Sequence, residues 1–430
     1  MPILERMSTD RIKVYKFGGA SVKSAEAFRN VAHIVKTCGG ERQLLLVVSA
    51  MGKTTNALEQ VMDLAYKQQQ FEQEFQQSKA FHYGVLQELF PSPDSPAYVR
   101  VEELFEALYK TLQQIHPSDH YDKAYDQVVS YGELVASTLL HYYLQAEGLA
   151  NTWVDSRKYI QTDSTWREAK VNWPRAEQLI KRDLPPLLQQ QLVVTQGFLG
   201  GTSDGFTTTL GREGSDFSAA IFAYGLNAEE MSIWKDVEGL LNADPKHFAD
   251  TVCYPELSYQ ETVEMAYYGA SVIHPKTIKP LANKQIPLYV KSFLNPEGKG
   301  TKICDCRFDK IAPAYIIKEN QCLVSFSVKD FTFVSEQNLG TIFSALSELR
   351  MKINLMQNSA ISFSVCSDYH PERLQRLIQA LHDQFIIHYN TGLTLYTVKN
   401  YDAESLQKVT ENKEVLLEQR TRTTYQFASR

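Results

Sequence analysis

The sequence contains no long apolar run. No stretch approaches the roughly 18 consecutive apolar residues that cross a bilayer as a helix, so no membrane partner is expected. The first residues, MPILERMSTDR, carry charges where a secretory signal peptide has an apolar core. Both absences predict a cytoplasmic protein.

Cysteine is also scarce. Six cysteines are scattered over 430 residues, which is typical of reduced thiols in the cytosol. None has the spacing of a metal site, since Cys304 and Cys306 are separated by a single residue, too close for the usual zinc pattern. The sequence therefore predicts no metal ligands among its side chains.

An excess of positive charge is missing as well. The 44 basic and 50 acidic side chains give a net charge of −6, which argues against a general nucleic-acid binder. There is no GxGxxG fingerprint, so a dehydrogenase module is not expected. The 43% of hydrophobic residues is enough for a large core, and the length predicts two or three domains.

The first part of the chain has the pattern of an α/β protein. An apolar strand at 12–16, a glycine turn, an amphipathic helix at 25–37 and the apolar run LLLVV at 44–48 predict a parallel sheet covered on both faces. Residues 57–145 are predicted to be mostly helical. Beyond them we expect strands at 152–154, from 192, at 231–234 and at 286–291, the last of the sheet, with helices near 175–180, 217–224 and 259–268.

The pattern changes after NPEGKG at 295–300, which predicts a domain boundary. Strands at 321–328, 353–356, 361–366 and 385–388, with helices at 339–349 and 371–381, give a βαββαβ order of the ferredoxin-like type. A shorter second unit follows, with strands at 393–398, 414–417 and 423–427 and a helix at 403–409. In chain order this second unit lacks its last helix and strand.

The glycine-rich stretch at 192–216 stands out from the rest. It joins an apolar strand to Gly200, Gly201 and Gly211, and ends in Arg212 and Asp216. Such a loop offers backbone N–H groups and a guanidinium to anions and a carboxylate to an amine. It is equally compatible with a surface loop that leads into a helix capped by Ser215 or Asp216.

Each of the other candidate groups can be interpreted either as a functional residue or as an ordinary structural or solvated one. Lys16, at a strand end before Gly18 and Gly19, is either a phosphate-binding lysine or a solvated one. Glu133 shares a helix face with apolar residues and needs either a structural partner or a ligand cation. Gly52-Lys53-Thr54 is not a P-loop, because the glycine required five residues earlier is Val47.

Two later segments complete the candidates. Lys235 and Asp236 follow a strand, which fits either nucleotide contact at the end of a parallel sheet or a capped turn. His274 has no nucleophile motif near it and is expected to be structural.

Taken together, these pieces resemble the aspartate kinase branch of the amino acid kinase family. The matching blocks occur in the family's order over about residues 12–303: KFGGASV, VVSAMGKTTN, VVSYGELVAS, TQGF, TTTLGREGSD, IWKDVEGLLNADP, SYQETVEMAYYGASVIHPKTI and GKGTKI. The resemblance implies a three-layer α-β-α kinase domain at 1–300 with a helical insert at about 57–145. Residues 301–430 then correspond to a regulatory ACT-like region, with one full unit at about 318–390 and a shortened unit at about 391–430.

The resemblance implies that ATP, with Mg2+ bound mainly through the nucleotide, phosphorylates the side-chain carboxylate of L-aspartate to 4-phospho-L-aspartate. This is the first step towards lysine, threonine and methionine. Lys16, Glu133, Arg212 and Asp216 are the implied catalytic residues, and Thr55, Glu133, Arg212 and Ser215 the implied substrate ligands. The implied nucleotide ligands are Lys16, Gly18, Gly19, Ser49, Lys235, Asp236, Leu241, Lys246, Ser271 and Val272.

The chain departs from the family pattern at several positions. Ala20 replaces a threonine, and Glu213 replaces a glycine and adds a negative charge beside the implied phosphate path. Leu241, Lys246 and Ser271 stand where some members have Tyr, Arg and Lys. These departures concern the nucleotide contacts rather than the class of reaction.

The regulatory region and the alternatives remain hypotheses. An amino-acid effector is expected near residues 330–339, although Asn354 replaces an acidic residue of lysine-sensitive members. Pairing of ACT-like units predicts a homodimer. The alternatives are another amino acid kinase, acting on glutamate or N-acetylglutamate, and a non-catalytic amino-acid sensor.

Overall fold

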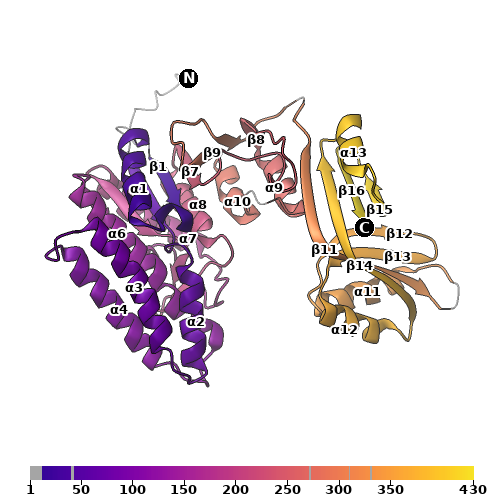
Figure 1. Ribbon diagram of the computed structural model, residues 1–430, viewed down its shortest axis with the longest axis horizontal. Coiled ribbons are helices and arrows are strands. Elements are labelled where there is room, and N and C mark those ends of the chain that lie inside the picture. The colour runs from indigo at the N-terminus through magenta and orange to yellow at the C-terminus, as the bar shows by residue number, and fades with distance from the viewer. Residues whose placement is uncertain (1–11, 40–42, 271–272, 309, 330–331) are drawn as a thin grey trace. The chain divides into compact units, whose positions relative to one another are not determined.

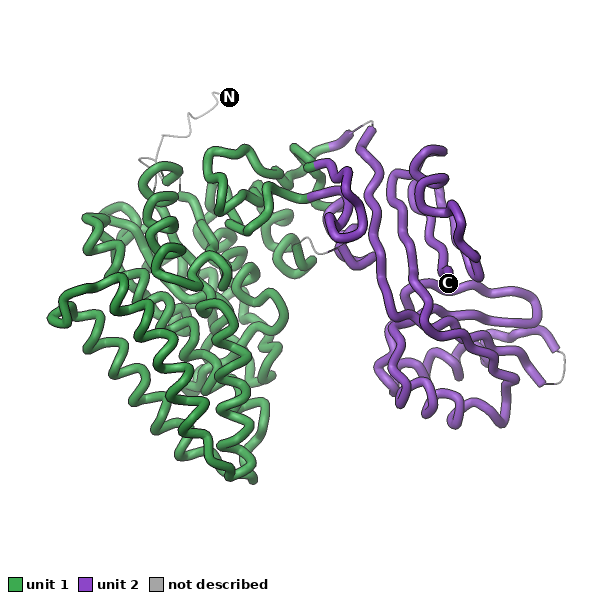
Figure 2. Tube along the Cα trace, in the orientation of Figure 1, with its two compact units in different colours: residues 1–240, 253–259, 273–306 green, residues 241–252, 260–272, 307–430 purple. Residues whose placement is uncertain are grey.

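The computed structural model describes residues 12–39, 43–270, 273–308, 310–329 and 332–430. Its chain forms two compact units (Figure 2). The first comprises residues up to Leu240, Cys253–Tyr259 and Ile273–Cys306. The second comprises Leu241–Val252, residues from Gln260 to the start of the 271–272 gap, and Arg307–Arg430. Each unit has its own sheet.

The first unit is built on an eight-stranded sheet with the order β3-β4-β2-β1-β7-β9-β10-β8. All neighbouring strands are parallel except β9 and β10. The predicted α/β class with a mainly parallel sheet is therefore confirmed. The strands are β1 (Lys13–Phe17), β2 (Leu44–Val48), β3 (Asn151–Trp153), β4 (Leu192–Gln196), β7 (Glu230–Lys235), β8 (Glu256–Ser258), β9 (Leu288–Ser292) and β10 (Thr301–Cys304).

Helices cover both faces of this sheet. Every residue of β2 is buried, as its continuous apolar run predicts. Alternate side chains of β1 and β2, including Tyr15, Phe17 and Leu46, pack in one core with α1 (Ala25–Cys38) and the helical insert. Helix α8 (Gly214–Leu226) also packs on β1 and β2. It contacts α7 (Trp173–Leu188) and α10 (Pro275–Asn283) in turn.

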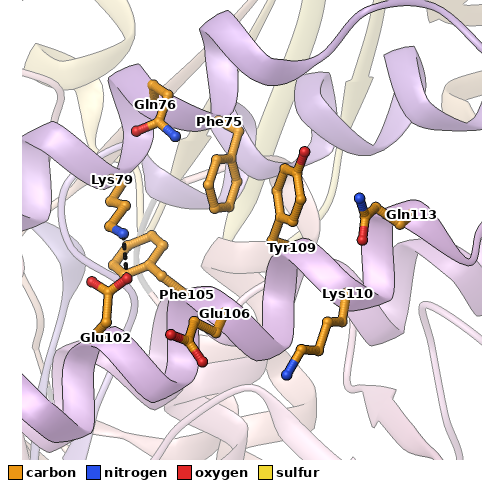
Figure 3. A pocket seen from close by; sticks show the side chains of 9 residues that line it. All are labelled: Phe75, Gln76, Lys79, Glu102, Phe105, Glu106, Tyr109, Lys110 and Gln113. Carbon is orange, nitrogen blue, oxygen red and sulfur yellow. Dashed lines mark hydrogen bonds and ion pairs between the residues drawn. The ribbon is translucent and has the colours of Figure 1, made fainter.

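The insert between β2 and β3 is helical, as predicted. It consists of α2 (Thr54–Tyr66), α3 (Glu72–Leu89), α4 (Pro96–Gln113), α5 (Tyr121–Val129) and α6 (Tyr131–Ala146). Phe75 of α3 packs on Phe105 and Tyr109 of α4. Figure 3 shows these rings in a shallow cavity between α3 and α4, with the ion pair of Lys79 and Glu102 beside them. Among the described helices, none combines the length and apolar content needed to cross a bilayer.

The second unit contains an antiparallel six-stranded sheet with the order β12-β13-β11-β14-β16-β15 (Figure 1). Its strands are β11 (Ala314–Val328), β12 (Ile353–Asn358), β13 (Ser362–Asp368), β14 (Phe385–Lys399), β15 (Val415–Arg420) and β16 (Thr424–Ser429), with helices α11 (Glu336–Glu348), α12 (Pro371–Leu381) and α13 (Ala403–Thr410). The βαββαβ pattern is present here.

The two longest strands serve both halves of this sheet. Residues 321–328 of β11 pair with the first half of β14, and Ala314–Lys318 pair with its second half, at Leu395–Lys399. Each half thus has four strands, β12-β13-β11-β14 in one and β15-β16-β14-β11 in the other. The beginning of β11 therefore supplies the fourth strand of the second half, beside β14.

Several sequence-based expectations are corrected. The strand at 286–291 is not the last of its sheet, because β10 follows and pairs with it. The strands expected at 385–388 and 393–398 are one strand, β14. The short strands β5 (Leu199–Gly201), β6 (Thr207–Thr209), β8 and β10 are not predicted, because strands of three or four residues are too short to show a period. Helix α10 is not predicted either.

The core of the insert contains a buried histidine, His82 of α3. Its Nδ1 lies 2.7 Å from the carbonyl oxygen of Ser78, and its Nε2 lies 3.2 Å from Oγ1 of Thr54 at the start of α2. Burial lowers the pKa of the imidazole from 6.5 to about 4.

Because this pKa is lower in the folded than in the unfolded chain, the unfolded state takes up the proton first as the pH falls from about 6.5 to 4. We expect the free energy of unfolding to drop by about 2 kcal/mol between pH 7 and pH 5 from this group. His82→Gln should remove that part of the pH dependence in urea titrations. The control His33→Gln, at an exposed imidazole, should keep it. An unchanged pH dependence in His82→Gln would contradict this role.

Candidate active site

A cavity of about 380 Å³ lies at the carboxyl ends of the central strands. Lys16 comes from β1, Ser49 follows β2, Phe198 follows β4 and Lys235 ends β7. In open α/β sheets this edge is where ligands bind, because the loops after parallel strands converge there. The lining residues are Lys16, Gly19, Ser49, Ala50, Gly52, Thr55, Glu133, Phe198, Gly211, Glu213, Gly214, Ser215, Asp216 and Lys235.

A buried ion pair forms the floor of this cavity. Nζ of Lys16 lies 2.6 Å from Oδ1 of Asp216, and their side chains are 10% and 4% exposed. Asp216 stands in the first turn of α8, where the helix dipole favours a negative charge. The sequence, in which the two residues lie 200 positions apart, gives no sign that they touch.

The second charged group is Glu133, in the first turn of α6. Its carboxylate is completely buried, and burial raises its pKa from 4.5 to about 8, opposed by hydrogen bonds from the backbone of Ala50 and of Glu133 itself and by the nearby charge of Lys16. Within the described part of the chain, its Oε2 has no hydrogen-bond partner. An unpartnered buried acceptor at the wall of a cavity is suited to a ligand cation.

Glycines allow these elements to approach one another. A Cβ on Gly19 would lie 2.9 Å from the carbonyl oxygen of Ala50, and one on Gly132 would lie 2.9 Å from the Cβ of Ala50. The loop after β2 can therefore pack between the glycine turn and the start of α6 only because both positions lack a side chain. This packing brings Glu133 and Lys16 to the same cavity.

The loop before α8 explains Glu213. This residue adopts a left-handed conformation, with φ of 52°, at the N-terminus of α8. Its Oε2 accepts a hydrogen bond of 2.9 Å from the backbone N–H of His274. The imidazole of His274 in turn accepts from the backbone N–H of Lys276 and caps α10, which matches the structural role expected of it. The carboxylate of Glu213 thus ties the loop before α8 to the start of α10.

The structure brings most of the candidate residues together. Gly18 adjoins the cavity, since a Cβ there would lie 3.4 Å from Nζ of Lys16. Arg212 is exposed beside the lining and makes no hydrogen bond or ion pair with the described residues. The candidates that line the cavity are Lys16, Gly19, Ser49, Thr55, Glu133, Ser215, Asp216 and Lys235.

The remaining nucleotide candidates lie elsewhere. Asp236 lines a neighbouring cavity of about 770 Å³ with Lys23, Arg29 and His33. Leu241 and Lys246 belong to the second unit. Ser271 and Val272 lie outside the described residues.

Sequence reasoning missed Phe198 as a lining residue. Its only unusual feature is a positive φ of 68°, which is a property of the backbone and leaves no signal in the residue type. A Cβ on Gly214 would lie 2.5 Å from its ring, so the glycine and the phenylalanine fit each other.

Comparison with known proteins identifies the class of this site. Residues 11–292 match the model of the Amino acid kinase family. The matched region contains the cavity and every described residue that lines it. The sheet and cavity are therefore those of an amino acid kinase.

Comparison with individual relatives identifies the branch of this family. Lysine-sensitive aspartokinase 3 of Escherichia coli (strain K12) is 30% identical over 360 residues, which are 83% of this chain and 78% of that protein. Two structures of E. coli aspartokinase III, with lysine and aspartate (T-state) and with aspartate and ADP (R-state), are 26% identical and cover 97% of this chain and 96% of theirs, with TM-scores of 0.81 and 0.79. The chain belongs to the amino acid kinase family, among its aspartokinases.

Other relatives are much longer. The bifunctional aspartokinase/homoserine dehydrogenase of Daucus carota is 29% identical over 395 residues, or 86% of this chain. The chain spans 42% of the length of that relative.

The buried carboxyl of Glu133 predicts a stability effect that is independent of any ligand. Because its pKa is higher in the folded than in the unfolded chain, its contribution to stability is lost as the pH rises from 4.5 to about 8. At pH 7 the free energy of unfolding of Glu133→Gln should therefore exceed that of the wild type by on the order of 3 kcal/mol. The variant should accordingly unfold at a higher urea concentration. This gap should grow with pH across that range.

The matched control is Glu102→Gln. The pKa of Glu102 is lowered by hydrogen bonds from Lys79 and Tyr83, which outweigh the effect of its burial, so neutralising it should not stabilise the protein. Equal urea midpoints for the wild type and Glu133→Gln at pH 8 would show that burial of the ionised carboxylate does not destabilise the protein.

Proposed function

We propose that the protein transfers the γ-phosphoryl group of ATP to the side-chain carboxylate of L-aspartate, giving 4-phospho-L-aspartate and ADP. The observation that carries this proposal is the buried pair of Lys16 and Asp216 beside Glu133, whose Oε2 has no hydrogen-bond partner among the described residues, in a cavity at the strand ends. A relative solved with aspartate and ADP supports the choice of both substrates.

The substrate side of the cavity fits an amino acid. The Oε2 of Glu133 would accept a hydrogen bond from the α-ammonium group, whose charge would favour the ionised carboxylate. Arg212, with no partner among the described residues, provides a planar bidentate donor for the α-carboxylate. The hydroxyls of Thr55 and Ser215 line the same space and would fix the side chain of the substrate.

The reaction needs charge neutralisation more than proton transfer. The aspartate side chain is ionised at neutral pH, so its oxygen attacks the γ-phosphorus without a general base as the bond to the β-phosphate oxygen breaks. Lys16 stabilises the charge of the group in transfer, and Asp216 holds the ammonium of Lys16 in position. Asp216 thereby acts as a positioning residue.

The nucleotide is proposed to lie along the glycine turn and the end of β7, where Gly18, Gly19, Ser49 and Lys235 meet the cavity. Asp236, Leu241, Lys246, Ser271 and Val272 remain proposed contacts of its outer part. Hard oxygen ligands suit Mg2+, and the cavity has them in Asp216 and Glu213. Both are engaged, by Lys16 and by the backbone of His274, so a Mg2+ ion would be held mainly by the phosphates, whose charge it neutralises.

The second unit, with the region from 301 onward, is proposed to be regulatory. Its fold matches the relatives, of which one was solved with lysine. Asn354, expected to weaken lysine binding, is already engaged here: its Oδ1 accepts from Nζ of Lys318 at 2.9 Å, and its Nδ2 donates to Gln321 and Asp368. The effector region at 330–339 begins with two residues outside the described part, followed by the capping box of Ser335 and Asn338.

In the described part of the chain, β12 and β15 are the end strands of the six-stranded sheet, and an end strand can pair with a second copy, which supports the proposed homodimer. Sedimentation as a strict monomer would reject it. The cytoplasmic location remains a prediction.

One assay separates the candidate functions. ADP release is measured with L-aspartate, L-glutamate and N-acetyl-L-glutamate. We expect turnover with L-aspartate alone. Turnover with either of the others would favour another amino acid kinase, and none with any of the three would favour an amino-acid sensor.

Lys16→Ala should lower kcat roughly 100-fold or more, because the cation that stabilises the transferring group is lost. The matched control is Lys53→Ala, since Lys53 is an exposed lysine of the neighbouring loop. Activity that survives in Lys16→Ala, or falls equally in Lys53→Ala, would disprove the role given to Lys16.

Arg212→Lys should raise the KM for L-aspartate roughly 10-fold while changing kcat less, since a lysine cannot replace the bidentate contact. A changed KM for ATP with an unchanged KM for aspartate would place Arg212 on the nucleotide instead.

Feedback inhibition is tested with lysine, threonine and both together at saturation. We expect at least one of these conditions to lower kinase activity. Unchanged activity in all three rejects these effectors.

A further inference from the structure

A cluster of two thiols and a carboxylate lies at the end of the large sheet remote from β3. It consists of Glu256, Cys304 and Cys306, whose Oε and Sγ atoms all lie within 4.8 Å of one another. In the described part of the chain this is the one place where three such groups converge so closely. None of these residues lines the active-site cavity.

The register of two edge strands builds the cluster. In the parallel pair of β8 and β10, Lys302 lies opposite Glu256 and Cys304 opposite Ser258. Cys304 is the last residue of β10, and Cys306 follows after a bend at residue 305, which brings the second thiol to the same place. Sγ of Cys304 lies 3.0 Å from an Oε of Glu256, and Sγ of Cys306 lies 3.3 Å from the carbonyl oxygen of Leu257.

The three side chains are half-buried, so they are both held in place and reachable from solvent. Glu256 and Cys304 stand on the paired strands β8 and β10, and Cys306 lies two residues beyond the end of β10. Ligands on strands are held more accurately than ligands on a mobile loop.

The chemistry of this donor set is specific. Two thiolates and a carboxylate are ligands of Zn2+, which takes four tetrahedral ligands and keeps an open position when the protein supplies three. Hard cations such as Mg2+ and Ca2+ do not favour sulfur. At bond lengths of about 2.3 Å to sulfur and 2.0–2.2 Å to oxygen, tetrahedral ligand atoms lie roughly 3.5 Å apart, which these side chains reach with small rotations.

A positively charged side chain already contacts the carboxylate of the cluster. Nζ of Lys302 lies 2.9 Å from the same oxygen of Glu256 and balances its charge. A divalent cation would displace the thiol protons and the ammonium of Lys302 together.

We propose that Glu256, Cys304 and Cys306 form a binding site for Zn2+ or a cation of the same thiolate-preferring class, with one coordination position open to solvent. A cation there joins β8 to the end of β10. It therefore fastens the edge of the sheet at the last residues of the first unit. The site is separate from the phosphoryl-transfer chemistry and does not depend on it.

The test uses the full chain, reduced and freed of metal with a chelator. Zn2+ alone is titrated against a chromophoric competitor, and binding of one ion per chain is expected, with a rise in Tm on saturation. Cys304→Ser, Cys306→Ser and Glu256→Gln should each weaken binding at least 10-fold. The control Cys38→Ser, at another half-buried thiol of the same unit, should bind as the wild type does.

Co2+ provides a readout that requires no variant. Bound to the wild type, it should give thiolate-to-cobalt charge-transfer absorption, reduced by about half in each cysteine variant and retained in Glu256→Gln at higher Co2+. Circular dichroism and Tm of the metal-free proteins check that the variants fold. The proposal is overturned if the reduced wild type binds no Zn2+, if Cys38→Ser weakens binding as much as the others, or if the cobalt spectrum shows no thiolate ligand.

Discussion

The ion pair between Lys16 and Asp216 is the contact on which the candidate active site depends. Both groups are almost out of water, and removing either partner of a buried pair leaves an uncompensated charge that typically costs about 3–5 kcal/mol. The pair joins β1 to the first turn of α8, so it fixes the direction of that helix relative to the central strand. The ammonium is thereby held at the strand end, where the glycine turn leaves room for a ligand.

Glu133 differs from the ion pair of Lys16 and Asp216, because burial opposes the ionisation of its carboxyl. Among the described residues its Oε2 has no hydrogen-bond partner, and burial raises the pKa of its carboxyl to about 8, so the ionised carboxylate lowers the stability of the fold. A buried carboxylate of this kind is strongly stabilised by a bound cation, because the cation supplies the compensating charge that the surrounding protein does not. Lys16 forms an ion pair with Asp216, whereas Oε2 of Glu133 has no hydrogen-bond partner among the described residues, which is why the two residues are proposed to bind different substrates.

Much of the fold could be predicted from the sequence where local pattern and burial agree. The run LLLVV predicts β2 with its correct bounds, and the amphipathic segment from Pro371 predicts α12. In both, the pattern of apolar residues extends over the whole length of the element. β14 was split in two because residues 389–392, ending in Gly392 with φ of 69°, break the apolar alternation. Pairing with β11 keeps the strand extended through this break, and that pairing spans more than sixty residues of sequence.

The site could be predicted as a set of residues but not as an arrangement. Family blocks named Lys16, Glu133, Ser215 and Asp216, whereas the contact of Glu213 with His274 and the position of Phe198 follow from backbone geometry that residue types do not encode.

The same limit applies to Cys304 and Cys306. Rules for metal sites are based on local spacing, and a single intervening residue excludes these two as a complete site. They become two ligands of three because the register of β8 and β10 brings in a carboxylate from 48 residues away. A sheet edge can therefore assemble a ligand set that no motif describes, since register determines which side chains meet across the strands.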